Sequence, residues 1–93
     1  MRRLLEDVLG CKWSWTVLEQ VHAGVRRPGQ MERAIEGIST KVLNERLRKL
    51  VDYGVLEKHE FAESPPRVEY TFTPLGVRFI GILQQIEALE SEA

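Results

Sequence analysis

The chain has 93 residues, of which 43% are hydrophobic and 29% are charged, and its formal net charge is −1. This composition predicts one globular domain and excludes both a disordered chain and a large two-domain enzyme with a deep cofactor cleft. Cys11 is the only cysteine, which excludes a disulfide scaffold, and no apolar run approaches the roughly 18 residues of a membrane-spanning helix.

The first eleven residues superficially imitate a secretion signal. Arg2-Arg3 is followed by Val-Leu-Gly-Cys at residues 8–11, as in twin-arginine or lipoprotein leaders. Such leaders need about 7–15 uninterrupted apolar residues after the basic pair. Glu6 and Asp7 interrupt that segment here. We therefore expect a cytoplasmic protein with a reduced thiol.

The near-zero net charge hides an uneven distribution. Residues 21–50 hold seven basic and three acidic side chains, whereas residues 51–75 hold two basic and five acidic ones. A basic stretch of this kind can attract a polyanion locally despite the neutral total. Taken alone, however, the charge favours the plainer interpretation of a solvated helix surface.

The first half of the chain reads as helices. Residues 2–9 predict a short helix that ends at Gly10, and Trp13 to Ala23 predicts a second one, with Gly24 in the left-handed conformation after it. Residues 25–27 are expected to be extended. A third helix, under two turns long, is predicted at residues 30–36 and closed by Gly37.

A fourth helix is predicted from Ser39, its N-cap, to about Tyr53, with Gly54 ending it. Its buried stripe is formed by leucine and valine at positions 43, 47, 50 and 51. At 100° per residue the opposite face carries polar side chains, namely Lys41, Asn44, Glu45, Arg48, Lys49 and Asp52.

After Gly54 the apolar period changes from 3.6 to 2. Residues 55–61 and 67–73 predict two strands, and the stiff Ala-Glu-Ser-Pro-Pro turn between them makes a hairpin. Thr73 and Pro74 then begin a last helix, which is expected to run to about residue 90. Its apolar residues cover more than one face, and this predicts a homodimer interface.

These elements predict a mainly α protein with a small antiparallel β-hairpin, an α+β fold of the winged helix-turn-helix type. The helix-turn-helix covers about residues 30–53 and the wing about 55–73, in a single domain spanning 1–93. The second helix of such a pair enters the major groove of double-stranded DNA. Because the basic stretch coincides with this helix pair, DNA binding becomes the favoured interpretation.

Several motifs together resemble the HxlR-type transcriptional regulators, relatives of the MarR group. They are Gly10-Cys11-Lys12-Trp13, Gly37-Ile38-Ser39, Gly54-Val55-Leu56, the Pro-Pro-Arg-Val-Glu-Tyr block at residues 65–70, and Thr73-Pro74-Leu75-Gly76. The likeness covers about residues 4–86. It implies a cytoplasmic, dimeric DNA-binding regulator whose first and last helices form the dimer.

The sequence departs from the family pattern at three places. Redox-sensing members often carry a cysteine ahead of the first helix, whereas the cysteine here, Cys11, stands at the second position of the usual Gly-Gly-Lys-Trp. Pro28 stands where an aromatic residue is common, so the start of the third helix is expected to differ. The short C-terminal extension leaves the extent of the dimer contact open.

The predicted DNA-contacting residues lie on the fourth helix and after the wing turn. Arginine pairs well with guanine, asparagine with adenine, and glutamate accepts from cytosine, while hydroxyls and amides at a helix N-terminus favour phosphate. Ser39 is equally well explained as a cap alone, and Arg67 as the partner of a strand glutamate. The wing's four glutamates argue against a strongly DNA-binding wing. The candidates are Ser39, Thr40, Lys41, Asn44, Glu45, Arg48, Lys49 and Arg67.

Two other functions remain as alternatives: a winged-helix protein-interaction module without DNA binding, and a thiol-based redox regulator using Cys11. Neither a metal site nor another cofactor is expected, because His22 and His59 are far apart with no further ligand at a suitable spacing. No nucleophile–base arrangement, phosphate loop or carboxylate pair indicates an enzyme, and no membrane partner is expected.

Overall fold

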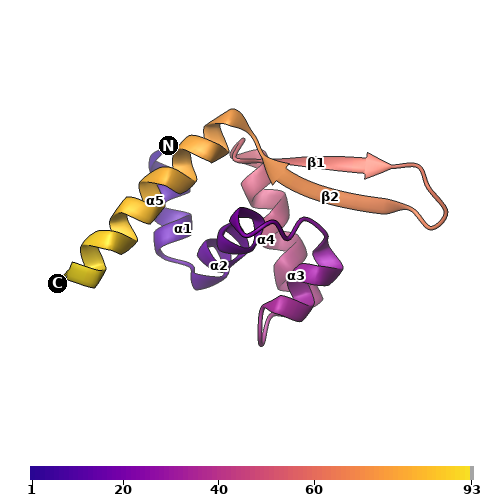
Figure 1. Cartoon of the computed structure of the whole chain (residues 1–93), viewed down its shortest axis with the longest axis horizontal. Coiled ribbons are helices and arrows are strands. Elements are labelled where there is room, and N and C mark those ends of the chain that lie inside the picture. The colour runs from indigo at the N-terminus through magenta and orange to yellow at the C-terminus, as the bar shows by residue number, and fades with distance from the viewer. Residues whose placement is uncertain (93) are drawn as a thin grey trace.

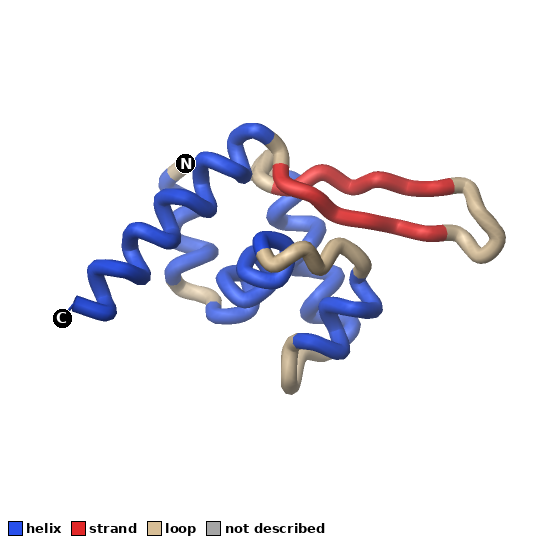
Figure 2. The backbone as a smooth tube through the Cα atoms, viewed as in Figure 1, coloured by secondary structure: helices blue, strands red, loops and turns tan. Residues whose placement is uncertain are grey.

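The computed structural model describes residues 1–92 and has seven elements (Figures 1 and 2). The bounds are α1 Arg2–Leu9, α2 Lys12–His22, α3 Pro28–Ala34, α4 Thr40–Asp52, β1 Leu56–Phe61, β2 Arg67–Phe72 and α5 Pro74–Glu92. The hairpin projects away from the helices at one end, and α1 and α5 lie at the other end (Figure 1). This arrangement confirms the mainly helical winged helix-turn-helix fold.

The third helix begins and ends two residues earlier than predicted. Pro28 occupies its first turn, where the fixed φ of proline suits a helix and its missing N–H costs nothing. Ile35 has left the helix, with φ −102° and ψ 102°, although its side chain remains buried. The prediction was wrong because it read the apolar spacing through Ile35 as continuous helix. Residues 25–27 form no strand; one bond joins the Tyr70 amide to the Arg26 carbonyl, at 2.8 Å.

The start of α4 follows from its local sequence. Gly37 takes φ +86°, which closes the turn after α3 in a conformation that suits glycine. The Ser39 hydroxyl then accepts a 3.1 Å hydrogen bond from the Val42 amide, as an N-cap should. Leu43, Leu47 and Leu50 are buried, and α4 packs against α2, α3 and the base of the hairpin. The core therefore holds one side of α4 and leaves the other to solvent.

The hairpin pairs its two strands in antiparallel register from Leu56 opposite Phe72 to Phe61 opposite Arg67. In the sequence the second strand alternates, with Val68, Tyr70 and Phe72 on one face and Arg67, Glu69 and Thr71 on the other, which predicts one buried and one exposed face. The structure does not show this alternation of burial: five of the six residues are half-buried and Tyr70 is buried. The face predicted to be exposed carries Arg67 and Glu69, whose side chains form an ion pair and are only 29% and 19% exposed. Because the two charged side chains pair with each other, this face of the strand is half-buried rather than exposed.

Helix α5 is capped as the sequence predicts, with the Thr73 hydroxyl accepting a 3.0 Å hydrogen bond from the Gly76 amide. At Gly76 a β-carbon would lie 2.0 Å from the Val55 carbonyl oxygen, so only glycine allows this approach of α5 to the wing base. Two side-chain bridges join α5 to α2, from Trp15 to Glu87 at 3.0 Å and from His22 to Gln84 at 2.7 Å. No helix within residues 1–92 has the length and apolar character needed to cross a membrane.

Candidate nucleic-acid interface

The outward side of α4 is a polar surface with little internal pairing. Its long side chains repeat at three- and four-residue intervals and therefore share one face of the helix. Glu45 is half-buried at the edge of this face. The exposed members are Lys41, Asn44, Arg48, Lys49 and Asp52, and within residues 1–92 none of them has a side-chain ion pair or hydrogen bond. The structure thus places five of the predicted residues together on one surface.

The two hydroxyls at the start of α4 have internal partners. Ser39 caps the helix, as described above, and the Thr40 hydroxyl donates to the Glu32 carboxylate of α3. The Thr40–Glu32 bond joins the first residue of α4 to α3, and so links the two helices of the helix-turn-helix. Ser39 and Thr40 are exposed and adjacent to the free amides at the N-terminus of α4.

Arg67 is the predicted residue that the structure sets apart from the others. Its Nη2 lies 3.2 Å from Glu63 Oε1, and its guanidinium carbon lies 4.1 Å above the centroid of the Phe61 ring. Its Nε is buried 3.4 Å from Glu69 Oε2, an ionic contact without the geometry of a hydrogen bond. With its side chain only 29% exposed, Arg67 takes the glutamate-paired alternative that the sequence left open.

A second group of basic residues adjoins the helix pair. Arg26, Arg27 and Arg33 are all exposed, and Arg27 Nε lies 3.8 Å from Glu69 Oε2 of the wing. Arg27 and Arg33, with Arg67, line a cleft of about 510 Å³ between the start of α3 and the wing turn. These three arginines belong to the basic stretch of residues 21–50 but are not among the candidates predicted from the sequence.

Cys11 lies on the other side of α4 from the polar surface. It is half-buried, and Arg46 Nη1 donates toward its Sγ at 3.8 Å. Burial raises the pKa of the Cys11 thiol, but the backbone amides of Ser14 and Trp13, the Ser14 hydroxyl and the Arg46 charge together bring it below its ordinary value. The lowered pKa favours the thiolate form of Cys11, and the single cysteine cannot form a disulfide within the chain.

The helix pair, the hairpin and the polar face of α4 together define a winged helix-turn-helix protein. The HxlR-like helix-turn-helix family model matches residues 8–93. The chain belongs to this family.

Relatives and solved structures agree with that assignment. The chain is 41% identical over 86 residues to an uncharacterized HTH-type transcriptional regulator of Synechocystis, covering 92% of this chain and 64% of that protein. It is 35% identical over 81 residues to another such regulator of Bacillus subtilis, covering 87% and 69%. These names describe regulators and not enzymes, as the sequence predicts for this chain.

A crystal structure described as a MarR-family transcriptional regulator of Enterococcus faecalis V583 is also similar, with a TM-score of 0.87 and 32% identity. The likeness covers 97% of this chain and 82% of that one. It therefore extends over the helices at both ends as well as over the helix-turn-helix and the wing.

Proposed function

We propose that the protein is a sequence-specific DNA-binding transcriptional regulator that acts as a homodimer and inserts α4 into the major groove. The unpaired polar face of α4 is the observation that carries this proposal. A major groove about 12 Å wide admits a helix, and base edges there offer the donors and acceptors that asparagine, arginine and glutamate recognise. The names of the relatives and the family support the same function.

Roles within the face follow from position along α4. The N-terminal residues of a recognition helix contact base edges, and residues further along meet the backbone. Thr40, Lys41, Asn44 and Glu45 are therefore assigned to sequence choice, with Ser39 at the helix start beside phosphate. Arg48 and Lys49 are assigned to phosphates. Arg67 supports the wing and contacts DNA only if it leaves its glutamates.

An exposed apolar stripe on α5 supports the homodimer. Leu75, Ile82 and Leu89 recur at seven-residue intervals, so they lie on one side of the helix, and they are 38%, 49% and 66% exposed. Leu9 of α1 is also exposed, at 51%. A stripe of this length on so small a chain supports an interface with a second copy. A two-fold axis through it would set two copies of α4 about 34 Å apart, one turn of DNA.

Selection of bound sequences from a random DNA pool tests the function directly. We expect enrichment of a two-fold symmetric site, and an affinity for it at least about 1,000-fold above that for random DNA at physiological salt. Sedimentation of the free protein at micromolar concentration should give a dimer. A pool that yields no preferred sequence contradicts the regulator, and would favour a protein-interaction module instead; a stable monomer contradicts the homodimer alone.

A further inference from the structure

The cleft between the start of α3 and the wing turn, called the arginine cleft below, brings three arginines together. Arg27, Arg33 and Arg67 line it, and Glu63 is the acidic residue among its lining side chains. Arg33 is exposed and has no ion pair within residues 1–92. A concave surface rich in arginine suits phosphate groups, because a guanidinium presents several N–H donors and a permanent positive charge.

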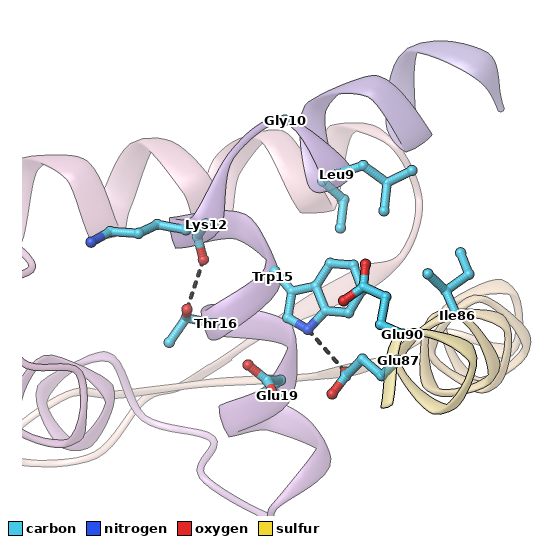
Figure 3. A pocket seen from close by; sticks show the side chains of 10 residues that line it. Leu9, Gly10, Lys12, Trp15, Thr16, Glu19, Ile86, Glu87 and Glu90 are labelled. Carbon is cyan, nitrogen blue, oxygen red and sulfur yellow. Dashed lines mark hydrogen bonds between the residues drawn. The ribbon is translucent and has the colours of Figure 1, made fainter. Parts of the chain in front are cut away.

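A second cleft, at the end of the molecule away from the wing, has the opposite charge. It lies between the α1–α2 corner and α5, where Glu19, Glu87 and Glu90 line it with one lysine, Lys12 (Figure 3). A polyanion such as DNA is repelled by this second cleft and attracted to the arginine cleft. The distribution of charge therefore favours DNA phosphate at the wing end of the chain.

Glu63 presents a carboxylate oxygen to Arg67, as a DNA phosphate would. Glu63 Oε1 lies 3.2 Å from Arg67 Nη2. The residue belongs to the wing turn, where its amide donates to the Phe61 carbonyl at 2.9 Å, and its side chain is 51% exposed. An exposed carboxylate of the turn thus neutralises an arginine of the cleft.

Arg67 has two further contacts that hold its guanidinium in place. Its Nε lies 3.4 Å from Glu69 Oε2, on a side chain that is mostly buried. Its guanidinium carbon also lies over the Phe61 ring. Because neither contact involves Glu63, loss of the Glu63 carboxylate would leave the guanidinium at the cleft with Nη2 open to another anion.

We propose that Glu63 is an internal competitor of DNA phosphate, which neutralises Arg67 at the arginine cleft and so lowers the affinity of the chain for DNA. The inference rests on the DNA binding proposed above and adds a residue that opposes it. The Thr40–Glu32 bond joins α3 to the start of α4, so a duplex bound on α4 comes beside α3 and its cleft. Because phosphate contacts carry no sequence information, Glu63 limits binding to every sequence alike.

Glu63→Gln tests the proposal, because glutamine keeps the size of the side chain and removes its charge. On random-sequence duplex DNA we expect the variant to bind about three- to fivefold more tightly than the original chain, the size of one partly exposed ion pair. One added phosphate contact should also steepen the slope of log affinity against log salt by about 0.9. Fluorescence-anisotropy titrations of labelled DNA at graded salt measure both quantities, and thermal unfolding checks that the variant is folded.

Glu57→Gln is the matched control. Glu57 lies on the same hairpin, its side chain is 59% exposed, and it does not line the arginine cleft. Its ion-pair partner within residues 1–92 is His59, at 3.7 Å, and not an arginine. The substitution removes the same charge and so measures the general loss of repulsion from DNA. We expect a smaller gain in affinity than for Glu63→Gln and an unchanged salt slope.

Arg67→Ala separates a released arginine from a general effect of charge. In the original chain this substitution should change DNA affinity little, because Glu63 already neutralises Arg67. In the Glu63→Gln background the same substitution should remove the gain in affinity and restore the original salt slope. Such non-additivity shows that the two side chains act through each other.

Three results on DNA that binds overturn the proposal. They are no gain in affinity from Glu63→Gln, an equal gain from Glu57→Gln, and a gain that persists when Arg67 is replaced by alanine. Failure of the regulator is a different result, namely a random pool without a preferred site, and the Glu63→Gln gain on random DNA can still be measured in that case. If neither the original chain nor Glu63→Gln binds any DNA, both proposals are wrong.

Discussion

Helix α4 and the wing are neighbouring charged regions with opposite arrangements. Helix α4 has four basic and two acidic side chains, and residues 56–72 have two basic and four acidic ones. The exposed basic side chains of α4 face solvent, whereas both basic side chains of the wing pair with glutamates of the hairpin. The basic side chains exposed on α4 are therefore free to meet a polyanion, whereas those of the wing are neutralised by glutamates of the same hairpin.

This difference predicts different roles for α4 and the wing in DNA binding. A phosphate backbone attracts unpaired Lys and Arg, and each such contact makes binding salt-dependent. The wing would have to break the Arg67 pairs before it offered a cation, and its exposed glutamates would be repelled. Under the proposed function we therefore expect helix α4 to carry the affinity and sequence choice, while Glu69 of the wing contacts Arg27 at the N-cap of α3.

The largest effect is expected on the inner side of α4. Leu47 is fully buried, so Leu47→Ala should cost about 2–5 kcal/mol of unfolding free energy from lost packing and the cavity left behind. Thermal unfolding at fixed protein concentration measures this. The adjacent Arg48→Ala is the matched control and should unfold within a few degrees of the original. Equal losses in both variants would contradict the inner and outer sides described for α4.

The next effect concerns sequence choice on the outer side. Asn44→Ala should cost about 1–3 kcal/mol on the selected operator and little on random DNA, because the amide is assigned to a base edge. Its side chain is exposed, so thermal stability should not change. Mobility-shift titrations on both DNAs provide the measurement. An equal loss on both would place Asn44 at the backbone instead.

Arg48 and Arg67 compare the two regions directly. Arg48→Ala should weaken binding to operator and random DNA alike and reduce the slope of log affinity against log salt by about 0.9. Arg67→Ala should leave that slope nearly unchanged and instead lower stability by up to about 1 kcal/mol, through its partly exposed ion pairs. A salt slope that falls equally in both variants would show that the wing contacts phosphate after all.

The sequence predicted what local rules control. Ser39 and Thr73 could be identified as caps because a hydroxyl before an apolar helix has one favourable local use. Gly24 could be placed in the left-handed region, where Gly37 and Gly54, predicted only to end helices, also lie. The division of α4 into a buried and an exposed side followed from the helical spacing of its apolar residues. These features depend on residues no more than a few positions apart.

Contacts between elements could not be predicted from such short-range rules. Glutamates 63 and 69 hold Arg67 through the hairpin register and turn, and Glu87 meets Trp15 across 72 positions of sequence. The start of α3 was missed because the apolar spacing outweighed the preference of Pro28 for a first helical turn. Each miss arose where a neighbour in space, or a competing local rule, decided the outcome.

The smallest effect on DNA binding is expected at Cys11, on the side of α4 that faces away from the proposed groove contacts. Cys11→Ser should change operator affinity less than about threefold, because the site lies away from the proposed groove contacts and the serine hydroxyl can still accept from Arg46. The thiol should still be reactive, because its lowered pKa increases the thiolate fraction at any given pH. The pH midpoint of its alkylation by iodoacetamide should therefore lie below that of a free thiol, and Arg46→Gln should move it upward by removing the adjacent charge. Peroxide that abolishes DNA binding in the original chain but not in Cys11→Ser would instead make the thiol a sensor, with Arg46 as its link to the recognition helix.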